Sequence, residues 1–197
     1  MIEILILSLI QGITEFLPIS SSSHLILMSE YLAFKDQSLS IDVSLHIGSF
    51  IAVVVYFYRD IKEFFNDRII FYKIIVSSLP VMFAGFFLVE SGLIGKIRNI
   101  EIIAWTTIIF GILLYVSDKF KTENNIKNNF DYKAVLFIGL LQILSLVPGV
   151  SRSGIAITAA RFLNFKRTDS AKISFLISVP ILGAVTIFGC KNLIFSE

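Results

Sequence analysis

Apolar segments long enough, or nearly long enough, to cross a membrane alternate with short charged segments along the chain. Four of these segments are Ile41–Tyr58, Ile70–Val89, Ile102–Val116 and Ile173–Cys190. As a helix the first would be about 27 Å long, close to the roughly 30 Å thickness of a bilayer's hydrocarbon core. Two more, Met1–Ile19 and Ala134–Val147, are interrupted by polar residues and lead into serine-containing motifs. The pattern predicts an all-α polytopic membrane protein.

Composition supports this class and excludes others. The 197 residues are 55% hydrophobic and 16% charged, and the mean hydropathy is +0.82. We therefore interpret residues 1–197 as a single integral membrane domain. The net charge of +2 is spread over loops, so a nucleic-acid surface is not expected. Cys190 is the one cysteine, which excludes an internal disulfide and a cysteine metal cluster.

The distribution of basic residues predicts which loops face the cytoplasm. Residues 59–73, 118–133 and 161–172 each hold four Lys or Arg, whereas residues 28–40 hold one and residues 90–99 hold two. Because cytoplasmic loops are enriched in Lys and Arg, the three basic loops should be cytoplasmic.

This assignment constrains the segment between two of those loops. Residues 134–160 connect two cytoplasmic loops, so they must cross the membrane an even number of times or not at all. Because two spans would need about 20 residues each, the segment should enter the membrane and return on the same side. Such a re-entrant loop must be buried in protein or line a wet cavity.

Arg152 lies near the tip of this predicted loop. It is the only Lys or Arg between Lys133 and Arg161, and an intramembrane Arg usually marks a functional site. Pro148 and Gly149 should end the preceding helix. Ser151 and Ser153 then add hydroxyl and backbone N–H donors beside the guanidinium, a set that suits a phosphate. The alternative is an arginine at a helix end that snorkels to the interface.

The N-terminal segment resembles this one. Gln11, a proline and a serine cluster are matched by Gln142, a proline and a second cluster, 131 residues later. The segments beginning at Ser44 and Ser174 match at an offset of 130. We interpret residues 1–131 as repeat one and residues 132–197 as an incomplete repeat two, which lacks two helices because a full copy would end near residue ~262.

The charge pattern places the two repeats in opposite orientations. The sequence thus predicts an inverted-topology repeat with two re-entrant helical hairpins that meet near the midplane, where such folds bind substrate. Glu15, the following serines and His24 should then face Arg152.

Gln11 and Glu15 are four residues apart, so they share a helix face. A buried Glu15 needs a cation, a proton or Arg152, and the alternative to a functional role is a structural ion pair with Arg152. The serines of 20–23 could be nucleophiles or helix caps, and His24 could be an acid–base group or a structural residue. Asp42 and His46, at a membrane edge, are expected to have a secondary role or none.

Together these groups suffice for phosphoryl transfer to or from a lipid-linked phosphate. Two other functions fit the pattern. One is a lipid-phosphate transporter or flippase, because inverted repeats are common in transporters. The other is an inactive, truncated protein that only binds a lipid diphosphate.

Two motifs resemble the signatures of the bacterial undecaprenyl-diphosphate phosphatase family, the bacitracin-resistance type. These are the segment from Gln11 to His24 and the PGVSRSG segment from Pro148 to Gly154. The resemblance implies a hydrolase of the plasma (inner) membrane that converts undecaprenyl diphosphate to the monophosphate and phosphate. It thereby implies roles in peptidoglycan synthesis, cell shape and antibiotic resistance, with a site that opens to the outer face. The oligomeric state is open, a homodimer included.

The resemblance also implies roles for individual residues. The catalytic residues would be Glu15, Ser21, His24 and Arg152. Substrate would be bound by Gln11, Ser20, Ser22, Ser151, Ser153 and Gly149. Mg²⁺ or Ca²⁺ would be the cofactor, bound by Glu15 with Gln11. The chain departs from the family pattern at Gln11, often Glu, at Ser23, usually Gly, and at Ala156, usually Thr.

Overall fold

A computed structural model describes residues 2–34, 39–93 and 97–195, and within these ranges the regular elements are helices, apart from one isolated bridge between Asn124 and Phe165. In chain order they are α1 (Ile2–Thr14), α2 (Ser21–Tyr31), α3 (Leu39–Tyr56), α4 (Tyr58–Asn66), α5 (Arg68–Glu90), α7 (Ile100–Asp118), α8 (Ile126–Asn129), α9 (Tyr132–Leu141), the 3₁₀ helix η1 (Gln142–Leu146), α10 (Arg152–Phe162) and α11 (Arg167–Phe195). The predicted all-helical class is confirmed.

Three described helices are long and apolar enough to cross a membrane, namely α5, α7 and α11. The predicted span Ile41–Tyr58 corresponds to α3, which has the same length of 18 residues but starts two residues earlier, at Leu39, and ends at Tyr56. A new helix, α4, starts at Tyr58. The charged segment that follows, predicted as a loop, forms most of α4. Its exposed polar residues and buried Ile61 make it amphipathic, which explains why charge alone did not prevent a helix.

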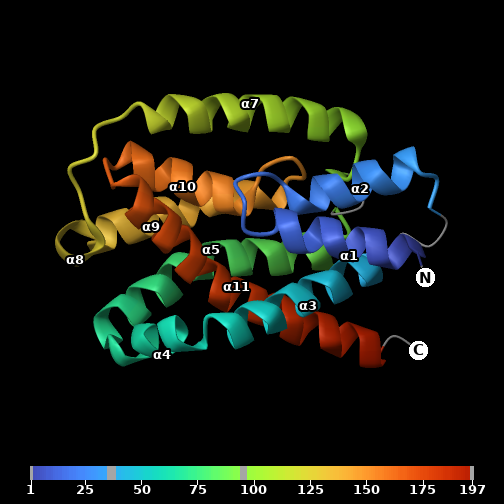
Figure 1. The fold of residues 1–197 in the computed structure, drawn as a ribbon, viewed down its shortest axis with the longest axis horizontal. Coiled ribbons are helices and arrows are strands. Elements are labelled where there is room, and N and C mark those ends of the chain that lie inside the picture. The colour runs from blue at the N-terminus through green and yellow to red at the C-terminus, as the bar shows by residue number, and fades with distance from the viewer. Residues whose placement is uncertain (1, 35–38, 94–96, 196–197) are drawn as a thin grey trace.

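Two short helical hairpins lie between the long helices (Figure 1). α1 and α2 form the first, with the N-terminus and the end of α2 at the same end of the molecule. α9, η1 and α10 form the second, which begins and ends at the opposite end, near α4 and α8. The two hairpins therefore enter from opposite ends, and their turns meet in the middle.

Helix α10 is largely buried and packs against α7, α9 and α11. Eight of its residues are buried, and the small side chains of Ala156, Ala159 and Ala160 let its neighbours approach closely. α9 is held as closely to α5, since a Cβ on Gly139 would lie 2.5 Å from the Ser77 carbonyl oxygen. The rigid inner layer of α5, α9, α10 and α11 thus fixes where the second turn lies.

Arg161 holds the end of α10 in place. Its side chain is 1% exposed, and its guanidinium donates to the carbonyl oxygens of Asp118, Phe120 and Phe165 at 2.9, 2.6 and 2.5 Å. These carbonyls belong to the C-terminus of α7 and to the α10–α11 connection. One side chain therefore joins three segments through backbone carbonyl groups near helix ends.

Candidate active site

Glu15 lies at the centre of the site, in the turn directly after α1. Its backbone N–H continues the helical pattern by donating to the Gln11 carbonyl oxygen at 3.0 Å. Its carboxylate is buried, with the side chain 2% exposed. One oxygen, Oε2, accepts from the Gln11 amide and from the Ser21 hydroxyl, each at 2.7 Å. The predicted i, i+4 relation of Gln11 and Glu15 is thus a direct hydrogen bond.

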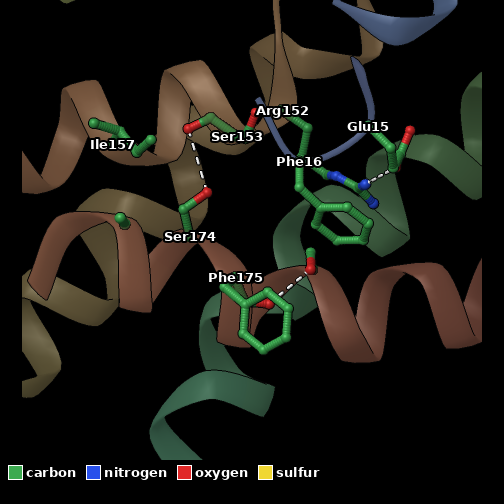
Figure 2. A pocket seen from close by; sticks show the side chains of 9 residues that line it. Glu15, Phe16, Arg152, Ser153, Ile157, Ser174 and Phe175 are labelled. Carbon is green, nitrogen blue, oxygen red and sulfur yellow. Dashed lines mark hydrogen bonds and ion pairs between the residues drawn. The ribbon is translucent and has the colours of Figure 1, made fainter. Parts of the chain in front are cut away.

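Arg152 contacts the other oxygen of the same carboxylate. It is the first residue of α10, and its guanidinium pairs with Glu15 Oε1 across 137 residues of sequence. Figure 2 shows the two side chains pointing toward each other from the two hairpins. This is the approach that the sequence repeat predicted, and it brings together a carboxylate, a hydroxyl and a guanidinium.

The serines after α1 act first on the local backbone. Ser20 is the N-cap of α2, and its side chain accepts from the Ser23 N–H at 3.4 Å. The Ser23 hydroxyl donates to the Ser20 hydroxyl at 2.8 Å, and the Ser22 hydroxyl lies 3.3 Å from the same oxygen. Ser21 alone turns its hydroxyl onto Glu15. The capping alternative therefore describes Ser20, and Ser21 is the serine placed for chemistry.

The N-terminus of α10 is capped by a serine in the same way. Ser151 is its N-cap and accepts from the Gly154 N–H at 3.1 Å. Its hydroxyl lies 3.0 Å from that of Ser153, which in turn donates to the Leu17 carbonyl oxygen at 2.5 Å. Leu17 belongs to the first turn, so this bond joins the two hairpins.

The two N-caps, Ser20 and Ser151, are 131 residues apart in sequence, the offset of the predicted repeat. Ser21 and Arg152 occupy the next position in their helices, and both contact Glu15. The N-termini of α2 and α10 therefore point into one site. Free N–H groups and the positive ends of two helix dipoles favour an anion there.

Gly149 shapes the second turn. Its φ of +94° lies in the region that favours glycine. A Cβ at this position would collide with the Thr106 hydroxyl and lie 2.8 Å from the Ile103 carbonyl oxygen. The Thr106 hydroxyl also donates to the Pro148 carbonyl oxygen at 2.6 Å. Gly149, which was predicted to bind substrate, therefore has a conformational role: it allows the turn to pack against α7.

A cavity of about 90 Å³ opens beside the Glu15–Arg152 pair (Figure 2). It extends between α10 and α11 and has both hydroxyl and aromatic walls. Its lining residues are Glu15, Phe16, Arg152, Ser153, Ile157, Ala171, Ser174, Phe175 and Ser178. The rings of Phe16 and Phe175, 6.0 Å apart, form its apolar side. A polar group could enter while an apolar chain remains outside.

His46, rather than His24, is the histidine next to Glu15. The Nε2 atom of His46 lies 3.4 Å from Glu15 Oε2. The ring of His24 places Nδ1 2.7 Å from the Ser20 carbonyl oxygen and lines a separate apolar cavity on α1 and α2. Among the described residues, no hydrogen bond or ion pair joins it to Glu15 or Arg152, and its catalytic role stays a prediction.

Sequence reasoning gave His46 a secondary role or none and did not predict its contact with Glu15. A signal was present, because Asp42 and His46 are four residues apart in an otherwise apolar helix. Asp42 pairs with Arg98, which lies just before α7. Two polar residues on one face of such a helix indicate an inward face. The sequence did not reveal that this face meets the turn after α1.

The donor set does not fit a divalent cation held by protein groups alone. Both oxygens of Glu15 are already engaged, by Gln11, Ser21, His46 and Arg152. The buried Oε1 of Gln11 has no partner, but one amide oxygen falls short of the six or more oxygen ligands that Mg²⁺ and Ca²⁺ take. Across the described ranges, no three His, Cys, Asp or Glu side chains converge.

Comparison with known proteins places this geometry in a family. Residues 4–197 match the family described as "Bacitracin resistance protein BacA". The chain is 49% identical over 194 residues to the undecaprenyl-diphosphatase of Pelagibacter ubique (strain HTCC1062), covering 98% of this chain and 76% of that protein.

Two further relatives carry the same name. The protein of Jannaschia sp. (strain CCS1) is 39% identical over 202 residues, covering 96% of this chain and 76% of its own length. The protein of Hahella chejuensis (strain KCTC 2396) is 42% identical over 200 residues, covering 95% of this chain and 74% of its own length. With such identity along nearly its whole length, this chain belongs to the BacA, or undecaprenyl-diphosphatase, family.

Proposed function

We propose that this protein hydrolyses undecaprenyl diphosphate to undecaprenyl phosphate and phosphate, and so recycles the cell-wall lipid carrier and confers resistance to bacitracin. The observation that carries the proposal is the contact of Ser21, Glu15 and Arg152 at the meeting point of two helix N-termini. The family membership of the chain and the name that its relatives share support the substrate. A transporter would need an anion site, but not a hydroxyl hydrogen-bonded to a buried carboxylate.

In the proposed complex the terminal phosphate lies between the two helix N-termini. Arg152 would turn its guanidinium from Glu15 to the phosphate, since a planar fork of donors suits its oxygens. The hydroxyls of Ser151 and Ser153 and the free N–H groups of α2 and α10 would bind further oxygens. Binding therefore exchanges one buried ion pair for another, which keeps the guanidinium partnered throughout.

The proposed reaction has two steps. Ser21 Oγ attacks the terminal phosphorus while Glu15 takes its proton, and the bond from phosphorus to the bridging oxygen breaks. Undecaprenyl phosphate leaves with that oxygen. Glu15 then passes that proton on to solvent and accepts one from a water molecule, which attacks the phosphorus of the phosphoserine. The bond from phosphorus to Ser21 Oγ breaks, Ser21 takes the proton back from Glu15, and phosphate is released. Positioning and charge stabilisation supply most of the acceleration in such transfers.

We further propose that the α1–α2 and α9–α10 hairpins are re-entrant and belong to an inverted repeat. The basic loops would face the cytoplasm, because Lys and Arg are enriched there. The α1–α2 hairpin would then enter from the outer face, and the lipid would approach from that side. The apolar cavity lined by Ile10, His24, Leu27, Met28 and Tyr31 supports this path.

A divalent cation would arrive with the substrate in this scheme, bound mainly to diphosphate oxygens. Mg²⁺ commonly binds through substrate phosphates and few carboxylates. When bound, it would neutralise charge on the phosphates. The protein's own contribution is the fixed set of donors around Glu15 and Arg152.

The direct test is phosphate release from undecaprenyl diphosphate by the purified chain in detergent, with Mg²⁺ or Ca²⁺ supplied. Arg152→Ala should lower kcat/KM by at least about a hundredfold, the usual cost of losing a charge-stabilising donor. Arg167→Ala is the matched control, because Arg167, at the start of α11, is exposed and its ion-pair partner among the described residues is Asp118, at the end of α7. No release by the unaltered chain would disprove the proposal.

A further inference from the structure

The ring of His46 is held in one orientation by its own helix. Its Nδ1 lies 2.7 Å from the Asp42 carbonyl oxygen. A carbonyl can only accept, so Nδ1 must carry the hydrogen. The other nitrogen, Nε2, lies 3.4 Å from Glu15 Oε2, within reach of an ion pair when the ring carries a hydrogen on both nitrogens. The imidazole thus joins the first turns of α3 to the carboxylate at the centre of the site.

Asp42 fixes the turn of α3 that carries this ring. Its side chain is 5% exposed and pairs with Arg98, which precedes α7. The pair crosses 56 residues of sequence, so the start of α3 is anchored to the start of α7. Charged and titratable groups facing the His46–Asp42 face are therefore Glu15 from the first turn and Arg98 from the residues before α7.

The other contacts of Glu15 indicate at which stage of the reaction the contact with His46 would be needed. In the structure, Arg152 holds Oε1, while Gln11 and Ser21 donate to Oε2. When Arg152 turns to a phosphate, Oε1 loses its partner. Gln11 and His46 are then the two side chains left to hold the carboxylate while its Oε2 receives the Ser21 proton.

We propose that His46 is a positioning residue, which carries a hydrogen on each ring nitrogen, donates from Nε2 to Glu15 and keeps the carboxylate on Ser21 once substrate has engaged Arg152. This inference rests on the proposed function. The positioning role requires a hydrogen-bond donor at the position of Nε2, and it does not require proton transfer to or from the imidazole. The distinction can be tested because glutamine and methionine have the same length, and only glutamine carries a donor at its end.

The experiment compares His46→Gln with His46→Met in the phosphate-release assay. The glutamine amide can occupy the position of Nε2, so this variant should keep kcat within about threefold of the unaltered enzyme. The methionine variant should lose about tenfold to a hundredfold in kcat, the worth of a hydrogen bond to a charged group. KM should change little in both, because Arg152 still binds the phosphate.

Two further variants separate positioning from folding. His46→Asn keeps a donor for the Asp42 carbonyl oxygen but is too short to reach Glu15, so it should resemble methionine in kcat and the native chain in thermal stability. Ser49→Ala is the control on the same helix, since that hydroxyl donates only to the Leu45 carbonyl oxygen at 3.1 Å.

Each outcome decides the question. Equal activity of the glutamine and methionine variants, whether high or low, overturns the positioning role. Equal and low activity would instead assign proton transfer to the imidazole. An unaltered chain that releases no phosphate would disprove the proposed function itself, which is a different result from an active chain insensitive to His46.

Discussion

At the scale of single residues, the buried carboxylate of Glu15 is held at both of its oxygens. A buried carboxylate is costly unless it is paired and hydrogen-bonded. Glu15 has an arginine on one oxygen and two hydrogen bonds of 2.7 Å on the other. This arrangement removes the cost of burial and, at the same time, puts a proton acceptor on the Ser21 hydroxyl. Stability and chemistry therefore depend on the same atoms.

Glu15→Gln should keep the size of the side chain but remove the proton acceptor. We expect kcat for phosphate release to fall by about a hundredfold to ten-thousandfold, the usual contribution of a general base. Glu15→Asp keeps the charge but draws it back by one methylene, so it should retain more activity than the glutamine variant. Steady-state kinetics on both variants test this order. A glutamine variant with more than a tenth of the native kcat would contradict the role.

The sequence was sufficient to pair Glu15 with Arg152, because a lone acid and a lone base in apolar segments have few other partners. It could not rank the histidines. His24 lies in the serine motif and His46 lies outside it, yet only His46 approaches the carboxylate in the described structure. The distance between His46 and Glu15 depends on how α3 is rotated about its axis relative to α1. Neither residue spacing nor hydropathy predicts that rotation.

At the scale of elements, the turn between η1 and α10 depends on one glycine. Gly149 has a positive φ, and its α-carbon lies against Thr106 and the Ile103 carbonyl of α7. The turn presents Ser151 and Arg152 to the site, so the packing of this turn determines the position of the Arg152 side chain. A change at Gly149 should therefore affect both stability and phosphate binding.

Gly149→Ala should destabilise the protein by at least about 2 kcal/mol, from the unfavourable φ and the contact with α7. Gly12→Ala is the matched control, because a Cβ there meets nothing within 4 Å. In the last turn of α1 this change should be neutral or stabilising by up to about 1 kcal/mol. Thermal unfolding in detergent, followed by phosphate release, checks both. Equal melting temperatures for the two variants would contradict the packing argument.

Sequence patterns located most elements but not all of their ends. The proline–glycine pair correctly predicted the break before α10, since both residues have strong backbone preferences. The same reasoning treated the charged segment after residue 58 as a loop. There an amphipathic helix, α4, forms because its apolar side finds a partner in α5. Packing of α4 against α5 is a tertiary contact, and the local pattern of charges does not predict it.

At the scale of the whole molecule, the two hairpins meet from opposite ends (Figure 1). Their turns are joined by the Glu15–Arg152 pair and by the bond from Ser153 to the Leu17 carbonyl oxygen. The offset that relates the repeats in sequence also relates the two N-caps, Ser20 and Ser151. Repeat and charge patterns could therefore predict the arrangement, whereas the depth and shape of the cavity required side-chain packing.

The proposed orientation can be tested by cysteine labelling in intact cells. Cys190 is first replaced by serine, and single cysteines are then introduced at the exposed positions Glu30 and Asn128. A membrane-impermeant maleimide should label position 30 directly, because α2 would end at the outer face. It should label position 128 only after the cells are permeabilised, because the basic α8 region would be cytoplasmic. The reverse result would invert the proposed topology.

The meeting of the hairpins also sets an order of events during synthesis. Glu15 leaves the ribosome long before its partner Arg152, which follows 137 residues later. At about 5–20 residues per second, the delay is roughly 7 to 27 seconds. During that interval the carboxylate of the first hairpin lacks its arginine partner, which makes membrane depth costly for the hairpin. The N-terminal hairpin is therefore expected to take its final position late, when the second hairpin arrives, although it is made first.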